Sequence, residues 1–330
     1  MQDIVVYIRS RAKFGDQIVS FAALYQLKQW WPHATLRVVA QHEVSGYYRL
    51  LPWVDDCIEA KNLYTAVRAT PWRADMVVCL HHTSERYGLI SLLRRPKARL
   101  GFRNGRILDF AWTHAWRKNI NEYISLANLY LLNTYRPVQI EPMVRRCFEE
   151  IAALAPEAAA ADIVLVPGGG DGAFKRWGIQ NFVALADLLK ARLGTGSRFT
   201  FVLGPAESAE LAALQALGRP DFELASGRSI PQLTALMLGA RLIVANDCGP
   251  SHIGQGVCVP YVGVFNEPNP EWFWNRPYSA SVCPPPGCND IQAVPPDEVA
   301  QACFSVLQAP APAGSGQQDA GVAQQARRFV

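Results

Sequence analysis

The residues best placed to do chemistry lie in one short segment, from Val244 to Gly254, which reads VANDCGPSHIG. Its apolar start predicts the end of a strand, after which Asp247 can cap a helix and Gly249 and Pro250 suit the first turn. Exposed amides at a helix start bind anions such as a pyrophosphate, and His252 adds a donor one turn into the helix. The alternatives are that Asp247 is only a helix cap and that His252 is only a structural histidine.

A glycine-rich segment at residues 167–177, PGGGDGAFKRW, is the second candidate. It follows another apolar run, and it opens with Gly168 and Gly169. The adjacent cations Lys175 and Arg176 are suited to neutralise a phosphate that leaves during a reaction. The segment is not a Walker loop, which would need Gly-Lys-Ser/Thr at the start of a helix. A flexible surface turn is the alternative interpretation.

Strands and helices must position both candidate segments. In both halves of the chain, short apolar runs alternate with segments whose apolar residues recur with the period of a helix. Such runs are typical of buried parallel strands joined by crossover helices, so we predict two doubly wound α/β domains. Ligands bind such sheets at the carboxyl ends of the strands, where both candidates lie. The predicted strands are residues 4–8, 36–40 and 76–80 in the first half and 162–167, 198–203, 241–245 and 259–265 in the second, with helices after residue 16 and at 181–193.

The length of 330 residues fits two domains of ordinary size. The Ala-rich, weakly patterned residues 151–161 mark the break between them. We therefore predict an N-terminal domain at 1–155 and a C-terminal domain at 156–308. Residues 309–330 are rich in Ala, Gly, Pro and Gln without an apolar face, so we expect a disordered tail there.

The amino-acid composition excludes several classes of protein. Half of the residues are apolar and 18% are charged, which excludes a disordered, collagenous or coiled-coil chain. No apolar run approaches the length of a membrane span, and the N-terminus lacks the pattern of a signal peptide, so we expect a cytoplasmic protein. Eight scattered cysteines fit reduced thiols. The spacing of Cys283, Cys288 and Cys303, with no histidine nearby, does not favour a zinc site.

The net charge of +4 hides an asymmetry between the two halves. Residues 1–150 carry 21 Lys and Arg against 13 Asp and Glu, a net +8, whereas residues 151–330 carry 11 against 15, a net −4. The cations cluster from Arg94 to Arg106 and again at Arg117 and Lys118, so the first half favours an anionic partner. A solvated basic face is the alternative. No motif with interleaved aromatics accompanies the cluster, so nucleic acid is not the expected partner.

Taken in order, the motifs resemble those of the heptosyltransferases of glycosyltransferase family 9. The resemblance spans roughly residues 3 to 307. It rests on KFGD at 13–16 followed by a helix to Pro32, LGFR at 100–103, PGG at 167–169, KRW at 175–177, LGPAE at 203–207, NDCGPSH at 246–252 and PYVGVF at 260–265.

The resemblance implies a GT-B fold, in which two Rossmann-like domains face each other across a cleft. It implies that the first domain takes the acceptor and that the second takes the nucleotide-sugar donor. The implied reaction is an inverting transfer of a heptose from ADP-heptose to the inner core of lipopolysaccharide, without a metal or cofactor. The alternatives are another nucleotide sugar, a sugar-nucleotide epimerase, or a non-catalytic module that binds sugar nucleotides.

The resemblance also assigns roles to residues. Asp16 matches the catalytic aspartate that takes the proton of the acceptor hydroxyl, although it can also be read as the N-cap of a helix starting at Gln17. Glu207 is read as a helix cap rather than a ligand. The donor site is expected to include Gly168, Gly169, Lys175, Arg176, Asp247, Cys248, Gly249 and His252.

The acceptor is expected to be an anionic glycolipid or core oligosaccharide, bound by Ser10, Arg11, Lys13 and Arg103. A lipid-anchored acceptor and the basic first half fit peripheral contact with the inner membrane. The sequence departs from the family at Cys248, where a hydroxyl residue is usual, so a weaker donor stands near the expected phosphate. It departs again at residues 266–270, NEPNP, which leaves the donor sugar open.

Overall fold

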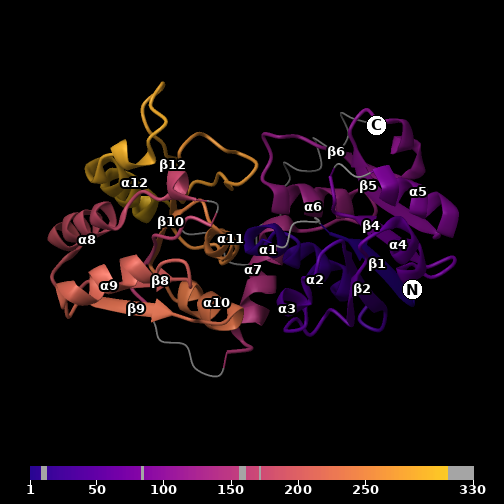
Figure 1. Cartoon of the computed structure of the whole chain (residues 1–330), viewed down its shortest axis with the longest axis horizontal. Helices are drawn as coiled ribbons and strands as arrows, with labels where there is room; N and C mark the ends of the chain where they lie inside the picture. The colour runs from indigo at the N-terminus through magenta and orange to yellow at the C-terminus, as the bar shows by residue number, and fades with distance from the viewer. Residues whose placement is uncertain (9–12, 83–84, 156–160, 171, 311–330) are drawn as a thin grey trace.

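A computed structural model describes residues 1–8, 13–82, 85–155, 161–170 and 172–310. Figure 1 shows two α/β units side by side, the first in indigo to magenta and the second in rose to yellow. Each unit is built on a six-stranded sheet whose neighbouring strands all run parallel. The prediction of two doubly wound domains is confirmed.

The first sheet has the order β3-β2-β1-β4-β5-β6. Its strands are β1 (Asp3–Tyr7), β2 (Thr35–Ala40), β3 (Asp56–Glu59), β4 (Met76–Cys79), β5 (Ala98–Arg103) and β6 (His114–Arg117). The helices of this unit are α1 (Phe14–Ile18), α2 (Phe21–Trp30), α3 (Ser45–Tyr48), α4 (Leu63–Ala69), α5 (Glu85–Arg94), the 3₁₀ turn η1 (Ile107–Ala111), α6 (Ile124–Asn133) and α7 (Ile140–Ala152).

The second sheet has the order β12-β11-β10-β7-β8-β9, the same arrangement when its strands are counted from β7. Its strands are β7 (Ile163–Val166), β8 (Phe199–Leu203), β9 (Phe222–Ser226), β10 (Leu242–Asn246), β11 (Tyr261–Val264) and β12 (Ser279–Val282). Its helices are η2 (Ala173–Lys175), α8 (Ile179–Leu193), α9 (Ser208–Leu217), α10 (Ile230–Leu238), α11 (Gly249–Gly256), η3 (Ile291–Ala293) and α12 (Pro296–Gln308).

Each sheet reverses its strand order at one point, and ligands bind such sheets at that point beyond the carboxyl ends of the strands. The reversal lies between β1 and β4 in the first sheet and between β7 and β10 in the second. The loop after β1 leads to Asp16, the loop after β7 to Lys175, and the loop after β10 to Asp247. The topology therefore directs the main candidates to the same edges of their sheets.

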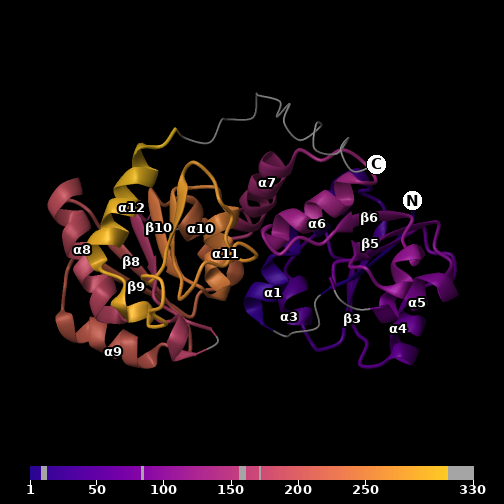
Figure 2. The same cartoon turned by 90° about the horizontal axis from the view of Figure 1, so that it is seen from above.

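The central strands are apolar because helices cover both faces of each sheet. Ile4, Val5 and Val6 are fully buried in β1, as are Val164 and Leu165 in β7. One buried apolar cluster runs from the first sheet through α7 to α10 and one face of the second sheet. Figure 2 shows α7 between the two units. The two units therefore share part of one hydrophobic core.

The helix predicted after residue 16 is wrong in its start and its continuity. It begins at Phe14 with Lys13 as N-cap, so Asp16 lies in the first turn and does not cap it. It is also broken before α2, where the Ser20 hydroxyl donates a 2.7 Å hydrogen bond to the Gln17 carbonyl. Such a bond competes with the helical ladder.

The predicted domain boundary between residues 155 and 156 adjoins a segment outside the described residues, and so does most of the predicted tail. Within the described part, α7 ends at Ala152 and α12 ends at Gln308. No helix of the described ranges is long and apolar enough to cross a membrane.

Candidate active site

The two units meet where α7 packs against α10 and, on the side of the candidate residues, where α1 meets α11. Two glycines make this approach possible. A Cβ at Gly249 would lie 2.9 Å from Cβ and Cγ of Phe14 and nearer still to its ring, and a Cβ at Gly15 would lie 3.0 Å from Cδ2 of His252. Any larger residue at Gly249 would push α1 and α11 apart, so the glycine sets the distance between the units.

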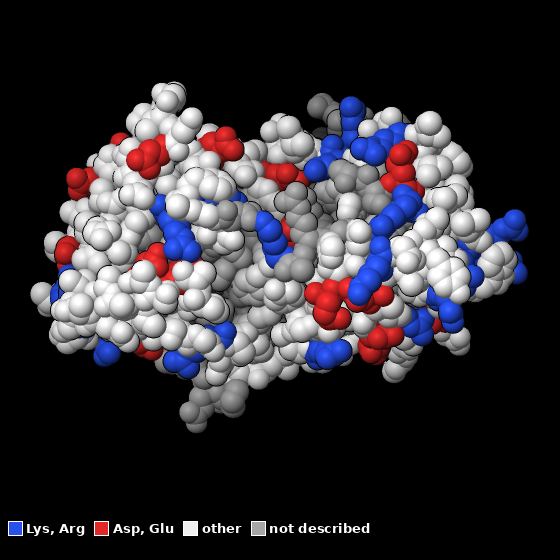
Figure 3. All heavy atoms as spheres, viewed as in Figure 1, with Lys and Arg blue, Asp and Glu red and all other residues white. Residues whose placement is uncertain are grey.

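A cleft of about 890 Å³, including its open mouth, lies at this junction. Residues of both units line it. The first unit contributes Lys13, Phe14, Gly15 and Asp16, and the second contributes Gly170, Lys175, Asp247, Cys248, Gly249, His252 and Trp272. Figure 3 shows the molecule from the side of Figure 1, with many Lys and Arg side chains on the first unit at the right.

Asp16 is a carboxylate sheltered from bulk water, with only 7% of the residue exposed. It lies in the first turn of α1, the first helix after β1. An acid in this turn is favoured by the amide dipoles of the helix. The arrangement places one carboxylate of the first unit opposite the start of α11.

Lys175 and Asp247 form an ion pair of 2.6 Å across the end of the second sheet. Lys175 ends η2 after β7, and Asp247 directly follows β10, so the pair joins the two strands that flank the reversal point. Asp247 does not cap α11, whose N-cap is Cys248. A cation is therefore held at the cleft by a buried carboxylate.

Cys248 opens α11 with an extended backbone, and its side chain makes no capping hydrogen bond. Pro250 in the first turn has no amide to satisfy, and the Ser251 hydroxyl donates to the Cys248 carbonyl at 2.7 Å. Burial raises the pKa of the Cys248 thiol to about 12. The thiol is neutral near pH 7, and the start of α11 keeps its partial positive charge toward the cleft.

His252 lies one turn into α11, 3% exposed, with its ring against the cleft. Its Nδ1 is 3.1 Å from the hydroxyl of Tyr123, a residue of the first unit. The ring of His252 also lies near that of Trp272, with ring centroids 5.4 Å apart. Neither Tyr123 nor Trp272 could be singled out from the sequence, because neither belongs to a motif.

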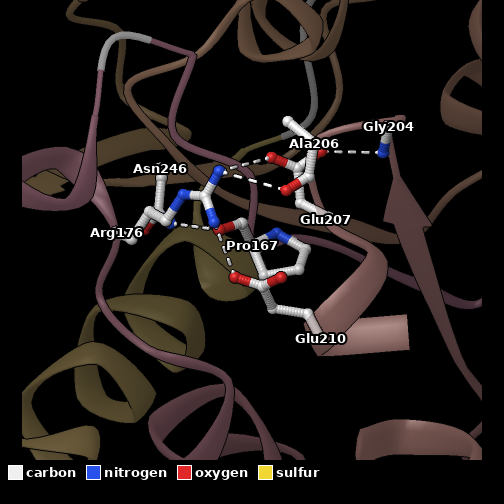
Figure 4. A network of polar contacts seen from close by, with 7 residues as sticks. All are labelled: Pro167, Arg176, Gly204, Ala206, Glu207, Glu210 and Asn246. Atoms are coloured by element: carbon white, nitrogen blue, oxygen red, sulfur yellow. Dashed lines mark hydrogen bonds and ion pairs between the residues drawn. The ribbon is translucent and has the colours of Figure 1, made fainter. Parts of the chain in front are cut away.

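Three residues predicted for the donor site are not among the described residues that line the cleft: Gly168, Gly169 and Arg176. Figure 4 shows the Arg176 guanidinium directed at two carboxylates, 2.8 Å from Glu210 and 3.2 Å from Glu207. Gly168 lies against Glu207, and Gly169 against the Arg176 side chain. An arginine engaged in this way fastens α9 to the loop after β7 rather than facing the cleft.

Glu207 stands at the N-cap position of α9, but its side chain does not cap the helix. It accepts a 2.9 Å hydrogen bond from the Gly204 amide, within the turn before the helix. In the same network, Asn246 donates to the Pro167 carbonyl at 2.7 Å and ties the ends of β7 and β10 together. These polar contacts fix the loops that carry Lys175 and Asp247.

The structure separates the residues predicted for the acceptor. Ser10 and Arg11 lie outside the described residues. Lys13 lines the cleft, whereas Arg103 is exposed at the end of β5, two strands away from β1. In the described ranges, no three His, Cys, Asp or Glu side chains gather as a metal site would need, and the prediction of a metal-free site stays a prediction.

Two Rossmann-like units that meet at one cleft form the GT-B fold, which a class of glycosyltransferases uses. The model of the family described as glycosyltransferase family 9 (heptosyltransferase) matches residues 73–284, and the chain belongs to that family. The protein is thus a glycosyltransferase. A search of curated proteins found no significant match.

Solved structures share the fold at low sequence identity. E. coli heptosyltransferase WaaC with ADP-2-deoxy-2-fluoro heptose has a TM-score of 0.69 at 15% identity, over 91% of this chain and 98% of that chain. E. coli ADP-heptose lps heptosyltransferase II has a TM-score of 0.61 at 18% sequence identity, and the match covers 93% of this chain and 98% of that chain. The UDP-GlcNAc 2-epimerase from Methanocaldococcus jannaschii has a TM-score of 0.54 at 11% sequence identity, and the match covers 99% of this chain and 100% of that chain.

Proposed function

We propose that the protein transfers a heptose from ADP-heptose to an anionic core-oligosaccharide acceptor of lipopolysaccharide, with inversion and without a metal. One observation carries the proposal: the sheltered carboxylate of Asp16 faces the same cleft as the Lys175–Asp247 pair and the start of α11. In this reading residues 1–155 hold the acceptor and residues 156–308 hold the donor. The named ligands of WaaC, ADP and a fluorinated ADP-heptose, support the choice of donor.

The donor end of the cleft offers three features that favour a diphosphate. The start of α11 presents backbone amides, Lys175 supplies a cation, and His252 supplies a ring N–H. Asp247 holds the ammonium group in place before the donor arrives, at 2.6 Å. A charge that is positioned beforehand does not have to reorganise during the reaction. We infer that Lys175 contacts the diphosphate while it remains paired with Asp247.

Transfer then needs one proton acceptor and one stabilised leaving group. Asp16 takes the proton from the acceptor hydroxyl, whose oxygen attacks the anomeric carbon from the face opposite the diphosphate. The bond between that carbon and the phosphate oxygen breaks, and ADP leaves with the electron pair. Lys175, His252 and the α11 amides stabilise the negative charge that it gains.

The acceptor side of the proposal includes peripheral contact with the cytoplasmic face of the inner membrane. Lys13 in the cleft and Arg103 outside it supply positive charge toward an anionic glycolipid. Trp72 is 56% exposed, and the guanidinium carbons of Arg94 and Arg95 each lie 6.0 Å from the centre of its ring. Aromatic and cationic side chains together suit an anionic lipid surface. The same unit exposes Leu93, Ile107 and Phe110.

An activity assay tests the proposal. Purified protein is mixed with ADP-heptose and a core acceptor that lacks the heptose, and ADP release is followed with and without the chelator EDTA. We expect ADP release that depends on the acceptor, resists EDTA and gives a product of inverted anomeric configuration. Isomerisation of a UDP-sugar without any acceptor would favour an epimerase, and no turnover with any nucleotide sugar would favour a binding module.

A further inference from the structure

Tyr123 belongs to the first unit, but its side chain packs against residues of the second unit. The residue precedes α6, and the next amide, that of Ile124, donates to the Glu271 carbonyl at 3.0 Å. On the other side, Lys118 Nζ lies 2.9 Å from Glu271 Oε1. Both contacts cross between the units. They bring the Tyr123 side chain, 5% exposed, to a fixed place behind the cleft.

The Tyr123 ring packs against two rings of the second unit. Its centroid lies 5.9 Å from that of His252, at an interplanar angle of 26°, and 6.1 Å from that of Trp274, at 15°. The Arg276 guanidinium covers the Trp274 ring at 4.2 Å. A ring stacked in this way has little freedom to turn, so the direction of its hydroxyl is set by packing.

The hydroxyl of Tyr123 fixes which nitrogen of His252 carries the proton. Burial raises the pKa of this phenol, so it keeps its hydrogen at neutral pH. Among the described residues, Nδ1 of His252 is its one hydrogen-bond partner, at 3.1 Å. A buried O–H without an acceptor is costly, so the hydroxyl donates and Nδ1 accepts. In the neutral ring the proton then sits on Nε2.

Nε2 is also the nitrogen on the side of α1. A Cβ at Gly15 would lie 3.3 Å from it, and Gly15 and His252 both line the cleft. The ring thus has one nitrogen turned to Tyr123 and the other turned to the reacting groups. With the opposite tautomer, a lone pair on Nε2 would meet the donor's diphosphate and repel it.

We propose that Tyr123 is a positioning residue of the donor site, which holds His252 as the tautomer that donates from Nε2 to an anionic diphosphate. The inference rests on the proposed function, because it takes His252 to be a ligand of the donor. It adds that the donor site is completed by a residue of the acceptor-side unit. Binding of the diphosphate therefore depends on the docking of the two units.

The test uses the full chain and the variant Tyr123→Phe, which keeps the ring stack and removes only the hydroxyl. ADP binding is measured by calorimetry. Nitrogen NMR of protein labelled with [15N]histidine reports which nitrogen of His252 carries the proton, with His252→Ala to assign the signal. Tyr7→Phe is the matched control, since Tyr7 is another buried tyrosine whose hydroxyl bonds to Thr70, away from the cleft.

We expect wild-type His252 to carry its proton on Nε2 and Tyr123→Phe to show a mixture of tautomers. ADP affinity should fall roughly fivefold in Tyr123→Phe, the worth of one neutral hydrogen bond, and stay unchanged in Tyr7→Phe. A wild-type proton on Nδ1, or unchanged tautomer and affinity in Tyr123→Phe, would overturn the inference. Failure of the proposed function is a different result: wild-type protein would not bind ADP, or His252→Ala would bind it equally well.

Discussion

The substitution Gly249→Ala tests the close approach of α1 and α11. The added Cβ would lie 2.9 Å from both Cβ and Cγ of Phe14, a separation that Cβ atoms in folded proteins essentially never show. The Phe14 Cβ belongs to the backbone frame of α1 and cannot rotate away. The helices must therefore move apart by several tenths of an ångström or more, which carries Asp16 away from the start of α11.

Two opposing effects determine how much stability Gly249→Ala loses. Overpacking in a close contact costs about 1–3 kcal/mol, and replacement of glycine in a helix returns at most about 1 kcal/mol. The net loss of stability is therefore expected to be at most about 3 kcal/mol. Misplacement of a catalytic group by about 1 Å lowers turnover about 100-fold. The transfer rate should therefore fall much further than the affinity for ADP.

The assay compares kcat, ADP affinity and thermal unfolding of Gly249→Ala with those of Gly46→Ala. Gly46 is the matched control, because an added Cβ there meets nothing within 4 Å and its backbone needs no glycine. Phe14→Ala added to Gly249→Ala removes the ring and should recover part of the lost stability. Full activity and stability of Gly249→Ala would refute the claim that this glycine sets the distance between the units.

Three further predictions concern single side chains. Asp16→Asn should lower the transfer rate about 10²- to 10⁴-fold and leave ADP affinity unchanged; a nearly normal rate would exclude Asp16 as the base. Burial raises the pKa of Cys248 to about 12, so mass spectrometry should find this thiol unmodified after iodoacetamide treatment of the folded protein at pH 7.5; rapid modification would contradict its burial. A backbone amide and Lys97 lower the pKa of Asp75 to about 2, below its unfolded value, so the stability it adds is present at pH 5–7 and lost as the pH falls toward 2. Asp75→Asn should lower the urea midpoint at pH 6 and match wild type near pH 2, and equal midpoints at pH 6 would contradict this.

The fold could be predicted from the sequence because its signals are local. The strands on either side of each reversal point are almost entirely apolar, as in Ile4–Ile8, and a strand covered on both faces requires that composition. The candidate segments follow such runs, so the reversal of strand order brings Lys175 and Asp247 together. The break between α1 and α2 could not be predicted, because it depends on the hydroxyl bond of Ser20.

The site could be predicted only in part, because tertiary contacts decide which way a side chain points and which residue it pairs with. Adjacent residues Lys175 and Arg176 look equivalent in the sequence, yet one lines the cleft and the other pairs with Glu207 and Glu210. Tyr123 is 129 residues from His252, and no local pattern joins them.

Calorimetric titration of ADP, UDP, GDP and CDP tests whether the cleft between the units is the site of an ADP-sugar donor. It is made on wild-type protein, Lys175→Ala and Lys190→Ala. Lys190 is the matched control, since it forms a 2.8 Å pair with Asp221 away from the cleft. We expect selective binding of ADP that is lost in Lys175→Ala and kept in Lys190→Ala. Preference for another nucleotide, or ADP binding that survives in Lys175→Ala, would contradict it.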